Sequence, residues 1–138
     1  MNDRIISFPH LGDYSYFIKP LLYNVTGFKV MVAPPITKKT VSLGSKYSPD
    51  FICLPFKYNL GNYIEALDNG ANVLFQFGGG CRYGNYGTLQ KTILEDLGYN
   101  FLFYEFIKNG KTGSNYVYRM FKEINPDLSR SCLFKNLV

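Results

Sequence analysis

The strongest strand–turn–helix pattern of the chain lies in residues 71–98, which read ANVLFQFGGGCRYGNYGTLQKTILEDLG. Residues 71–77 are a nearly unbroken apolar run, which is typical of a buried strand. The triple glycine that follows ends this strand. Apolar side chains then recur at helical spacing over residues 86–97, and Gly98 is positioned to cap the helix. We therefore predict a strand, a glycine-rich turn and a helix in succession.

Strands and helices alternate in the same way along the rest of the chain. Further strands are expected at residues 4–8, 28–33, 50–54 and 100–107. Further helices are expected at residues 14–25, 38–47, 56–68 and 114–124, the second of them capped by Thr37. This alternation predicts an α/β fold, a three-layer Rossmann-like domain with a parallel sheet of about five strands in the order 2-1-3-4-5. The length of 138 residues suits one domain, expected over residues 1–128, and no pattern assigns the C-terminal tail at 129–138.

The charge distribution does not indicate a nucleic-acid partner. The net charge is +5, but the basic residues are scattered, and Lys38-Lys39 is the only adjacent basic pair. A solvated surface explains such scattered lysines better than a nucleic-acid site does. No run approaches the ~20 apolar residues needed to span a bilayer, and no signal peptide is visible. We therefore expect a cytoplasmic protein with neither a membrane nor a nucleic-acid partner.

Two of the three cysteines are predicted to end neighbouring strands. Cys53 lies at the end of the expected strand 50–54, and Cys81 lies in the glycine turn after strand 71–77. Because carboxyl ends of parallel strands meet at one edge of a sheet, the two backbones would lie about one strand spacing (~5 Å) apart. Two thiolates at that separation suit a shared metal or iron–sulfur cluster. An odd number of cysteines argues against a disulfide framework.

The glycine turn has further features that suit an iron–sulfur site. Small residues let the backbone approach a large anionic cluster, and the amides before the following helix offer N–H groups to its sulfurs. A neighbouring arginine adds positive charge that favours a thiolate. The predicted metal ligands are therefore Cys53 and Cys81. The predicted cofactor contacts are Gly79, Gly80, Arg82 and Gly84.

Each of these features also has a simpler interpretation. A lone cysteine after a strand is usually a small buried residue, so Cys53 taken alone suits a structural role, as Cys132 does. A strand, a glycine turn and a helix N-terminus also form an anion site. This turn lacks the Lys-Ser/Thr ending of a phosphate-binding loop. The alternative is therefore a metal-free module that binds an acyl-CoA or another phosphorylated ligand at the glycine turn.

Two more side chains are candidates for the same pocket. His10, the only histidine, follows the first strand and suits a metal ligand, a general acid or a plain surface-loop residue. Lys57 follows the Cys53 turn and faces either the pocket or solvent. No Ser/His/Asp set can be assembled from the sequence, so no catalytic residue is assigned.

Four motifs, taken in order, carry a resemblance to a known family. They are PPITKKT (34–40), LGSKYSP (43–49), CLPFK (53–57) with LGN (60–62), and GGCRYG (79–84) with LQ (89–90). Together they resemble the 2-hydroxyacyl-CoA dehydratase and CoA-enzyme-activase group. The similar part is the cysteine-containing domain that accompanies the activase ATPase, and the similarity runs through nearly all of residues 4–127.

The resemblance implies an oxygen-sensitive 4Fe–4S protein of anaerobic metabolism, with a role in low-potential electron transfer or CoA-ester dehydration. Cys53 and Cys81 fall on the family's cysteine turns, so the resemblance implies that both bind the cluster. It also implies a partner that completes the site. That partner is the activase ATPase or a second dehydratase-like domain or subunit.

Overall fold

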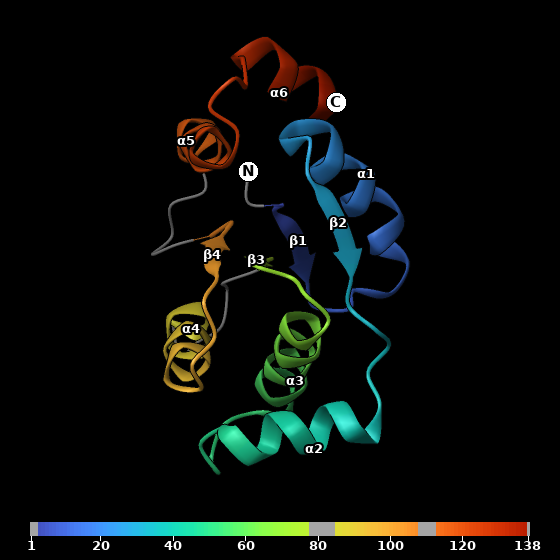
Figure 1. The fold of residues 1–138 in the computed structure, drawn as a ribbon, viewed down its shortest axis with the longest axis vertical. Helices are drawn as coiled ribbons and strands as arrows, with labels where there is room; N and C mark the ends of the chain where they lie inside the picture. Colours follow the sequence, from blue (N-terminus) through green and yellow to red (C-terminus); the bar gives the residue numbers. More distant parts are fainter. Residues whose placement is uncertain (1–2, 78–84, 108–112, 138) are drawn as a thin grey trace.

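The computed structural model describes residues 3–77, 85–107 and 113–137. Within these ranges the chain forms one parallel sheet of four strands, in the order β2-β1-β3-β4 (Figure 1). The strands are β1 (Ile5–Phe8), β2 (Lys29–Val32), β3 (Val73–Gln76) and β4 (Leu102–Glu105). The helices are η1 (Gly12–Tyr14, a 3₁₀ helix), α1 (Ser15–Thr26), α2 (Lys38–Tyr47), α3 (Leu54–Asp68), α4 (Tyr86–Asp96), α5 (Ser114–Ile124) and α6 (Arg130–Leu137). The predicted α/β class with a parallel sheet is confirmed.

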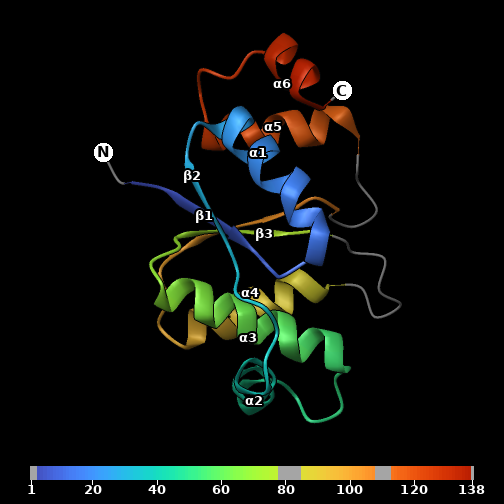
Figure 2. The ribbon, with the colours of Figure 1, turned by 90° about the vertical axis from the view of Figure 1, so that its right-hand side faces the viewer.

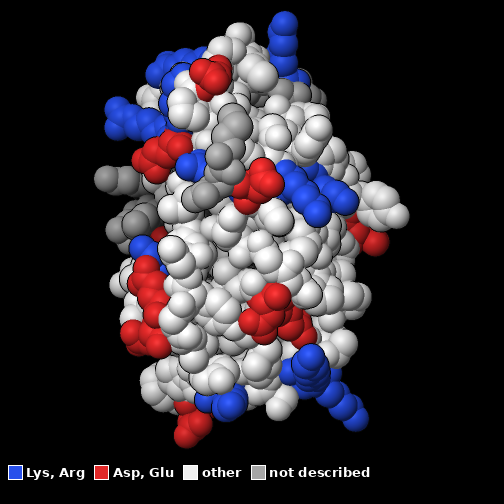
Figure 3. Space-filling view, in the orientation of Figure 1, with Lys and Arg blue, Asp and Glu red and all other residues white. Residues whose placement is uncertain are grey.

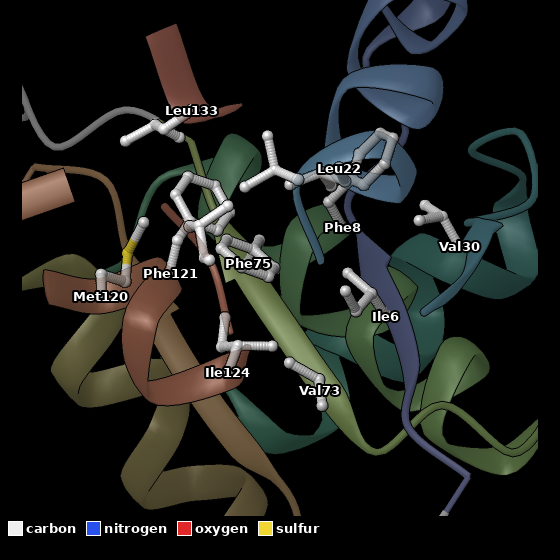
Figure 4. Packing of buried hydrophobic residues seen from close by; sticks show 12 residues of the cluster. Ile6, Phe8, Leu22, Val30, Val73, Phe75, Met120, Phe121, Ile124 and Leu133 are labelled. Atoms are coloured by element: carbon white, nitrogen blue, oxygen red, sulfur yellow. The ribbon is translucent and has the colours of Figure 1, made fainter. Parts of the chain in front are cut away.

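Helices cover both faces of the sheet, which gives three layers (Figure 2). α1, α5 and α6 lie on one face, α3 and α4 on the other, and α2 crosses the outer side of α3. Successive residues of β3 point to opposite faces, so that Val73 and Phe75 join the first core and Leu74 joins the second. In the first core the ring of Phe121 stacks on Phe75 with centroids 5.8 Å apart (Figure 4). A strand buried on both faces explains the nearly unbroken apolar run in the sequence.

The expected strand at residues 50–54 is wrong, which leaves four strands in the described sheet instead of about five. Residues 50–53 form a turn, in which the Ile52 N–H donates to the Pro49 carbonyl, and Leu54 begins α3. Pro55 lies in the first turn of that helix, where its missing N–H has no intrahelical partner to lose. The short apolar run between Pro49 and Pro55 is therefore a turn that leads into α3. β3 takes the place beside β1, and β4 follows it.

The predicted cap at Thr37 is confirmed, and a glycine in the left-handed region ends α1. Thr37 and Thr40 form a reciprocal capping box at the start of α2, each side chain accepting from the other residue's N–H. α1 is closed by Gly27, whose φ of 74° lies in the left-handed region. The tail that no pattern assigned contains α6, and its Leu133 is buried in the same core as Leu22 of α1.

The surface carries charges of both signs. Figure 3 shows basic and acidic side chains interspersed over the face that it presents. None of the described helices is both long and apolar enough to cross a membrane.

Candidate functional site

An apolar pocket opens where α3 and α4 begin. Its volume is about 430 Å³, and its lining consists of Phe51, Ile52, Cys53, Phe56, Asn85, Tyr86 and Leu89. α4 follows β3, and α3 runs back toward the start of β3, so both helices begin at the carboxyl edge of the sheet (Figure 2). Open α/β sheets bind their ligands outside this edge. The pocket therefore has the position expected of a ligand site in this fold class.

Cys53 is the residue directly before α3, and its exposed side chain lines the pocket. Its Sγ lies 3.3 Å from the hydroxyl oxygen of Tyr86. This hydrogen bond, followed by one from the Phe56 N–H, lowers the pKa of the Cys53 thiol, and partial burial opposes the shift. The lowered pKa enriches the thiolate, which is the form that binds metals and attacks electrophiles.

Tyr86 is a site residue that the sequence prediction missed. It is the first residue of α4, and its ring packs edge-on against Phe56, with centroids 4.8 Å apart and an interplanar angle of 76°. Phe56 is fully buried, so it holds the Tyr86 ring against the core. The available signal was positional, because Tyr86 stands two residues after Gly84 at the start of an expected helix.

The strand-end argument for pairing the two cysteine turns is wrong, because Cys53 follows a turn and not a strand. Cys53 nevertheless faces Asn85 and Tyr86, which directly follow the second turn in the sequence. The other predicted ligand and the cofactor contacts lie outside the described residues, and their roles stay predictions. These residues are Cys81, Gly79, Gly80, Arg82 and Gly84.

His10 and Lys57, the two candidate pocket residues, make hydrogen bonds outside the described pocket lining. The His10 N–H donates to Asn62 Oδ1 at 2.8 Å, and His10 Nδ1 is buried with no hydrogen-bond partner in the described part of the chain. Lys57 Nζ donates to the Asp50 carbonyl at 3.2 Å, which links α3 to the turn before Cys53. Neither side chain belongs to the described lining of the pocket, so a direct role there is still only predicted.

A polar cluster lies beside the start of α4, at the carboxyl ends of β3 and β4. The Tyr63 hydroxyl donates to Gln76 Oε1, and both side chains are buried. Burial, and then the negative charge of Glu105, raise the pKa of Tyr63, so this hydroxyl stays protonated and acts as a donor. The Glu105 carboxylate packs against Gly87, where a Cβ would lie 2.0 Å from Oε1. This contact brings a negative charge close to the N-terminus of α4.

The described residues supply one good ligand for a metal. Within residues 3–77, 85–107 and 113–137, no group of three His, Cys, Asp or Glu side chains could hold a metal ion. Cys53 fits a thiolate ligand, because its sulfur is exposed and its pKa is lowered. Cys132 belongs to α6 and packs against the core on the other face of the sheet. A metal site at Cys53 therefore needs ligands from residues 78–84 or from another chain or domain.

Fold and pocket together define a class, a three-layer α/β protein with a thiol-bearing apolar pocket at the carboxyl edge of its parallel sheet. No known family, curated protein or solved structure matched this chain. The motif resemblance to the dehydratase and activase group therefore stays a prediction.

Proposed function

We propose that this chain is an iron–sulfur protein related to 2-hydroxyacyl-CoA dehydratases and their activators, with Cys53 and Cys81 as cluster ligands. Its role is low-potential electron transfer or CoA-ester dehydration. One observation carries the proposal. The exposed Cys53 thiol, whose pKa is lowered, faces Asn85 and Tyr86, and these residues directly follow the turn that contains Cys81.

Cys53 has the chemistry of a cluster ligand. Iron in such clusters is bound by thiolates, and a lowered pKa favours the thiolate at neutral pH. Cys53 also precedes the N-terminus of α3, where the helix dipole favours negative charge. Four cysteines usually hold a 4Fe–4S cluster, so the remaining ligands would come from a second dehydratase-like domain or subunit, or from the activase ATPase. When bound, such a cluster supplies one-electron transfer.

Anaerobic reconstitution tests the proposal. The full chain is incubated with iron and sulfide under reducing conditions, and bound iron and sulfide are measured per chain, together with visible thiolate-to-iron absorption. The expected result is loading that falls strongly in Cys53→Ser and in Cys81→Ser. Cys132→Ser is the matched control, because Cys132 packs on the opposite side of the sheet and should load as the unchanged chain does.

Two outcomes contradict the proposal. One is that the unchanged chain binds no iron, either alone or in the presence of a dehydratase-like partner. The other is that all three serine variants bind as much iron as the unchanged chain, because the iron would then be held without Cys53 and Cys81.

The lining of the pocket favours a second candidate function, a metal-free module for an acyl-CoA. Phe51, Ile52, Phe56 and Leu89 give the cavity of about 430 Å³ a mainly apolar wall, which suits an acyl group. Calorimetric titration with hexanoyl-CoA tests this candidate. Binding should survive Cys53→Ser, and it should weaken in Leu89→Asn and in Arg82→Ala. Absence of binding to the unchanged chain rejects it.

A further inference from the structure

We infer that the outward face of α1 is a self-association surface, which binds α1 of a second copy of this chain in an antiparallel, two-fold arrangement. The centre of this face consists of the exposed side chains of Tyr16, Phe17, Pro20 and Tyr23. Their spacings of three and four residues place them side by side on the helix. α1 and the pocket at the starts of α3 and α4 lie on opposite faces of the sheet, so the inference is independent of the proposed function.

The outward face of α1 is aromatic, whereas a solvated helix face is usually charged or polar. α1 buries Leu22 and Val25 in the core, and it forms part of the side of the molecule that is turned to the viewer in Figure 2. Away from the core, Tyr16 is 83% exposed, Phe17 76% and Tyr23 57%. A patch of exposed aromatic side chains is typical of a protein–protein contact, because Tyr and Phe are enriched at the cores of such interfaces.

The size of this face suits a dimer. A fully exposed Tyr or Phe residue presents about 200 Å², so the three aromatic residues together expose roughly 400 Å². A standard interface takes about 800 Å² from each partner, with an apolar core and a polar rim. The aromatic residues therefore supply about half of that area as a core. Exposed residues around them supply a rim, and these are Asp13, Lys19 and Asn24.

The charges of this face point to a second copy as its occupant. Residues 11–27 contain one acidic and one basic residue, Asp13 and Lys19, so the face is neutral although the chain has a net charge of +5. Both are exposed, and each lies three residues from Tyr16, because η1 leads directly into α1. When two such helices pack antiparallel with Tyr16 at the two-fold axis, Asp13 of each copy faces Lys19 of the other. A two-fold contact of this kind pairs opposite charges twice.

A hollow beside Tyr16 offers the second copy a place for a side chain. Its volume is about 380 Å³, and it lies between α1 and the edge strand β2. Its mainly apolar lining consists of Ser15, Tyr16, Lys19, Pro20 and Val32. With Tyr16 at the two-fold axis, the Tyr16 ring of the second copy is placed over this hollow. Aromatic side chains that fill pockets near the centre of an interface supply much of its binding energy.

Sedimentation equilibrium of the full chain tests the inference. The unchanged chain should form dimers, and the double variant Tyr16→Ser with Phe17→Ser should bind itself at least roughly 100-fold more weakly. Both side chains are exposed, so this variant should keep its fold, which circular dichroism checks. Phe51→Ser is the matched control, because Phe51 is 89% exposed but lies in the turn before α3, and the dimer should be unchanged.

Charge reversal tests the antiparallel arrangement. Asp13→Lys should weaken the dimer roughly tenfold, because it places two positive side chains together at both contacts. The double variant Asp13→Lys with Lys19→Asp should restore the affinity of the unchanged chain. A double variant that binds no more tightly than Asp13→Lys overturns the arrangement.

Two outcomes overturn the self-association itself. One is an unchanged chain that stays monomeric throughout the micromolar range, including one that co-sediments with phosphatidylcholine vesicles, because the occupant would then be a lipid surface. The other is a Tyr16→Ser and Phe17→Ser variant that dimerises as tightly as the unchanged chain does, because the dimer would then use another surface.

Discussion

Gly61 of α3 lies directly against the carbonyl oxygen of Thr40 in α2, and a Cβ at Gly61 would be 2.0 Å from that oxygen. The contact is reciprocal, because a Cβ at Gly44 of α2 would be 1.7 Å from the carbonyl oxygen of Lys57 in α3. Two glycines therefore let the backbones of these helices touch. The contact supports the first turns of α3, where Cys53 is attached.

Gly61→Ala should destabilise the protein by about 1–3 kcal/mol, because the added methyl group meets backbone that can move only if one helix shifts. The free energy of unfolding in urea measures the effect. Gly113→Ala is the control, because no atom of the described residues outside its chain neighbours lies within 4 Å of a Cβ there, and its change should stay within about 0.5 kcal/mol. Equal stability of the two variants would contradict the close approach of α2 and α3.

Asn62→Ala should cost about 1–2 kcal/mol, because it removes the hydrogen-bond partners of two partly buried backbone groups. Asn62 is fully buried. Its Oδ1 accepts from the His10 N–H at 2.8 Å, and its Nδ2 donates to the Pro34 carbonyl at 3.2 Å. One side chain thus ties together the loops after β1 and β2. Urea unfolding measures the loss.

Asn69→Ala is the control for that measurement. Asn69 is exposed, although its Nδ2 also donates to a backbone carbonyl, that of Glu65, at 2.8 Å. Water can replace this bond, so the expected cost is below about 1 kcal/mol. If both asparagine variants lose the same free energy of unfolding, the burial of Asn62 does not set the cost of removing its hydrogen bonds.

Most of the fold could be predicted because its signals are local. The nearly unbroken apolar run at residues 71–77 predicts β3, and the capping chemistry of Thr37 predicts the start of α2. The strand prediction for residues 50–54 was wrong because an apolar composition does not distinguish a short strand from a turn that leads into a helix. Pro55, read as a helix start instead of a strand end, would have corrected that prediction.

The site was harder to predict than the fold, because it depends on which elements meet in space. Sequence placed Cys53 at a special turn, but its contact with Tyr86 joins residues 33 positions apart. That contact arises because α3 and α4 pack side by side and begin at the same edge of the sheet. The same reason explains why α6 was not predicted. Its sequence has little pattern, and its position depends on Leu133, whose side chain is buried in the core against α1.

Tyr99 should give the protein a component of stability that is lost at alkaline pH. Burial, and then the hydrogen bond to Asp68, raise the pKa of Tyr99 from 10 to about 12. The unfolded chain ionises this tyrosine near pH 10, and the folded chain does so near pH 12. The component is therefore fully present below pH 10 and is lost as pH rises toward 12.

Urea unfolding of the unchanged chain and of Tyr99→Phe over this pH range measures that component. The stability advantage of the unchanged chain over Tyr99→Phe should shrink as the pH rises above 10. An advantage that stays constant over the range would mean that Tyr99 ionises equally in the folded and unfolded states.

Cys53 should react as a thiolate at lower pH in the folded chain than in the unfolded chain. The Tyr86 hydroxyl and the Phe56 N–H lower the pKa of the folded thiol, so its thiolate persists to lower pH. Stability from these contacts is present above the unfolded pKa and is lost as pH falls through the lowered pKa. The pH dependence of iodoacetamide modification at the Cys53 peptide, without and with urea, measures both midpoints. Coincident midpoints would show that neither donor lowers the pKa of the Cys53 thiol in the folded chain, and the case for Cys53 as a metal ligand would then lose its main physical support.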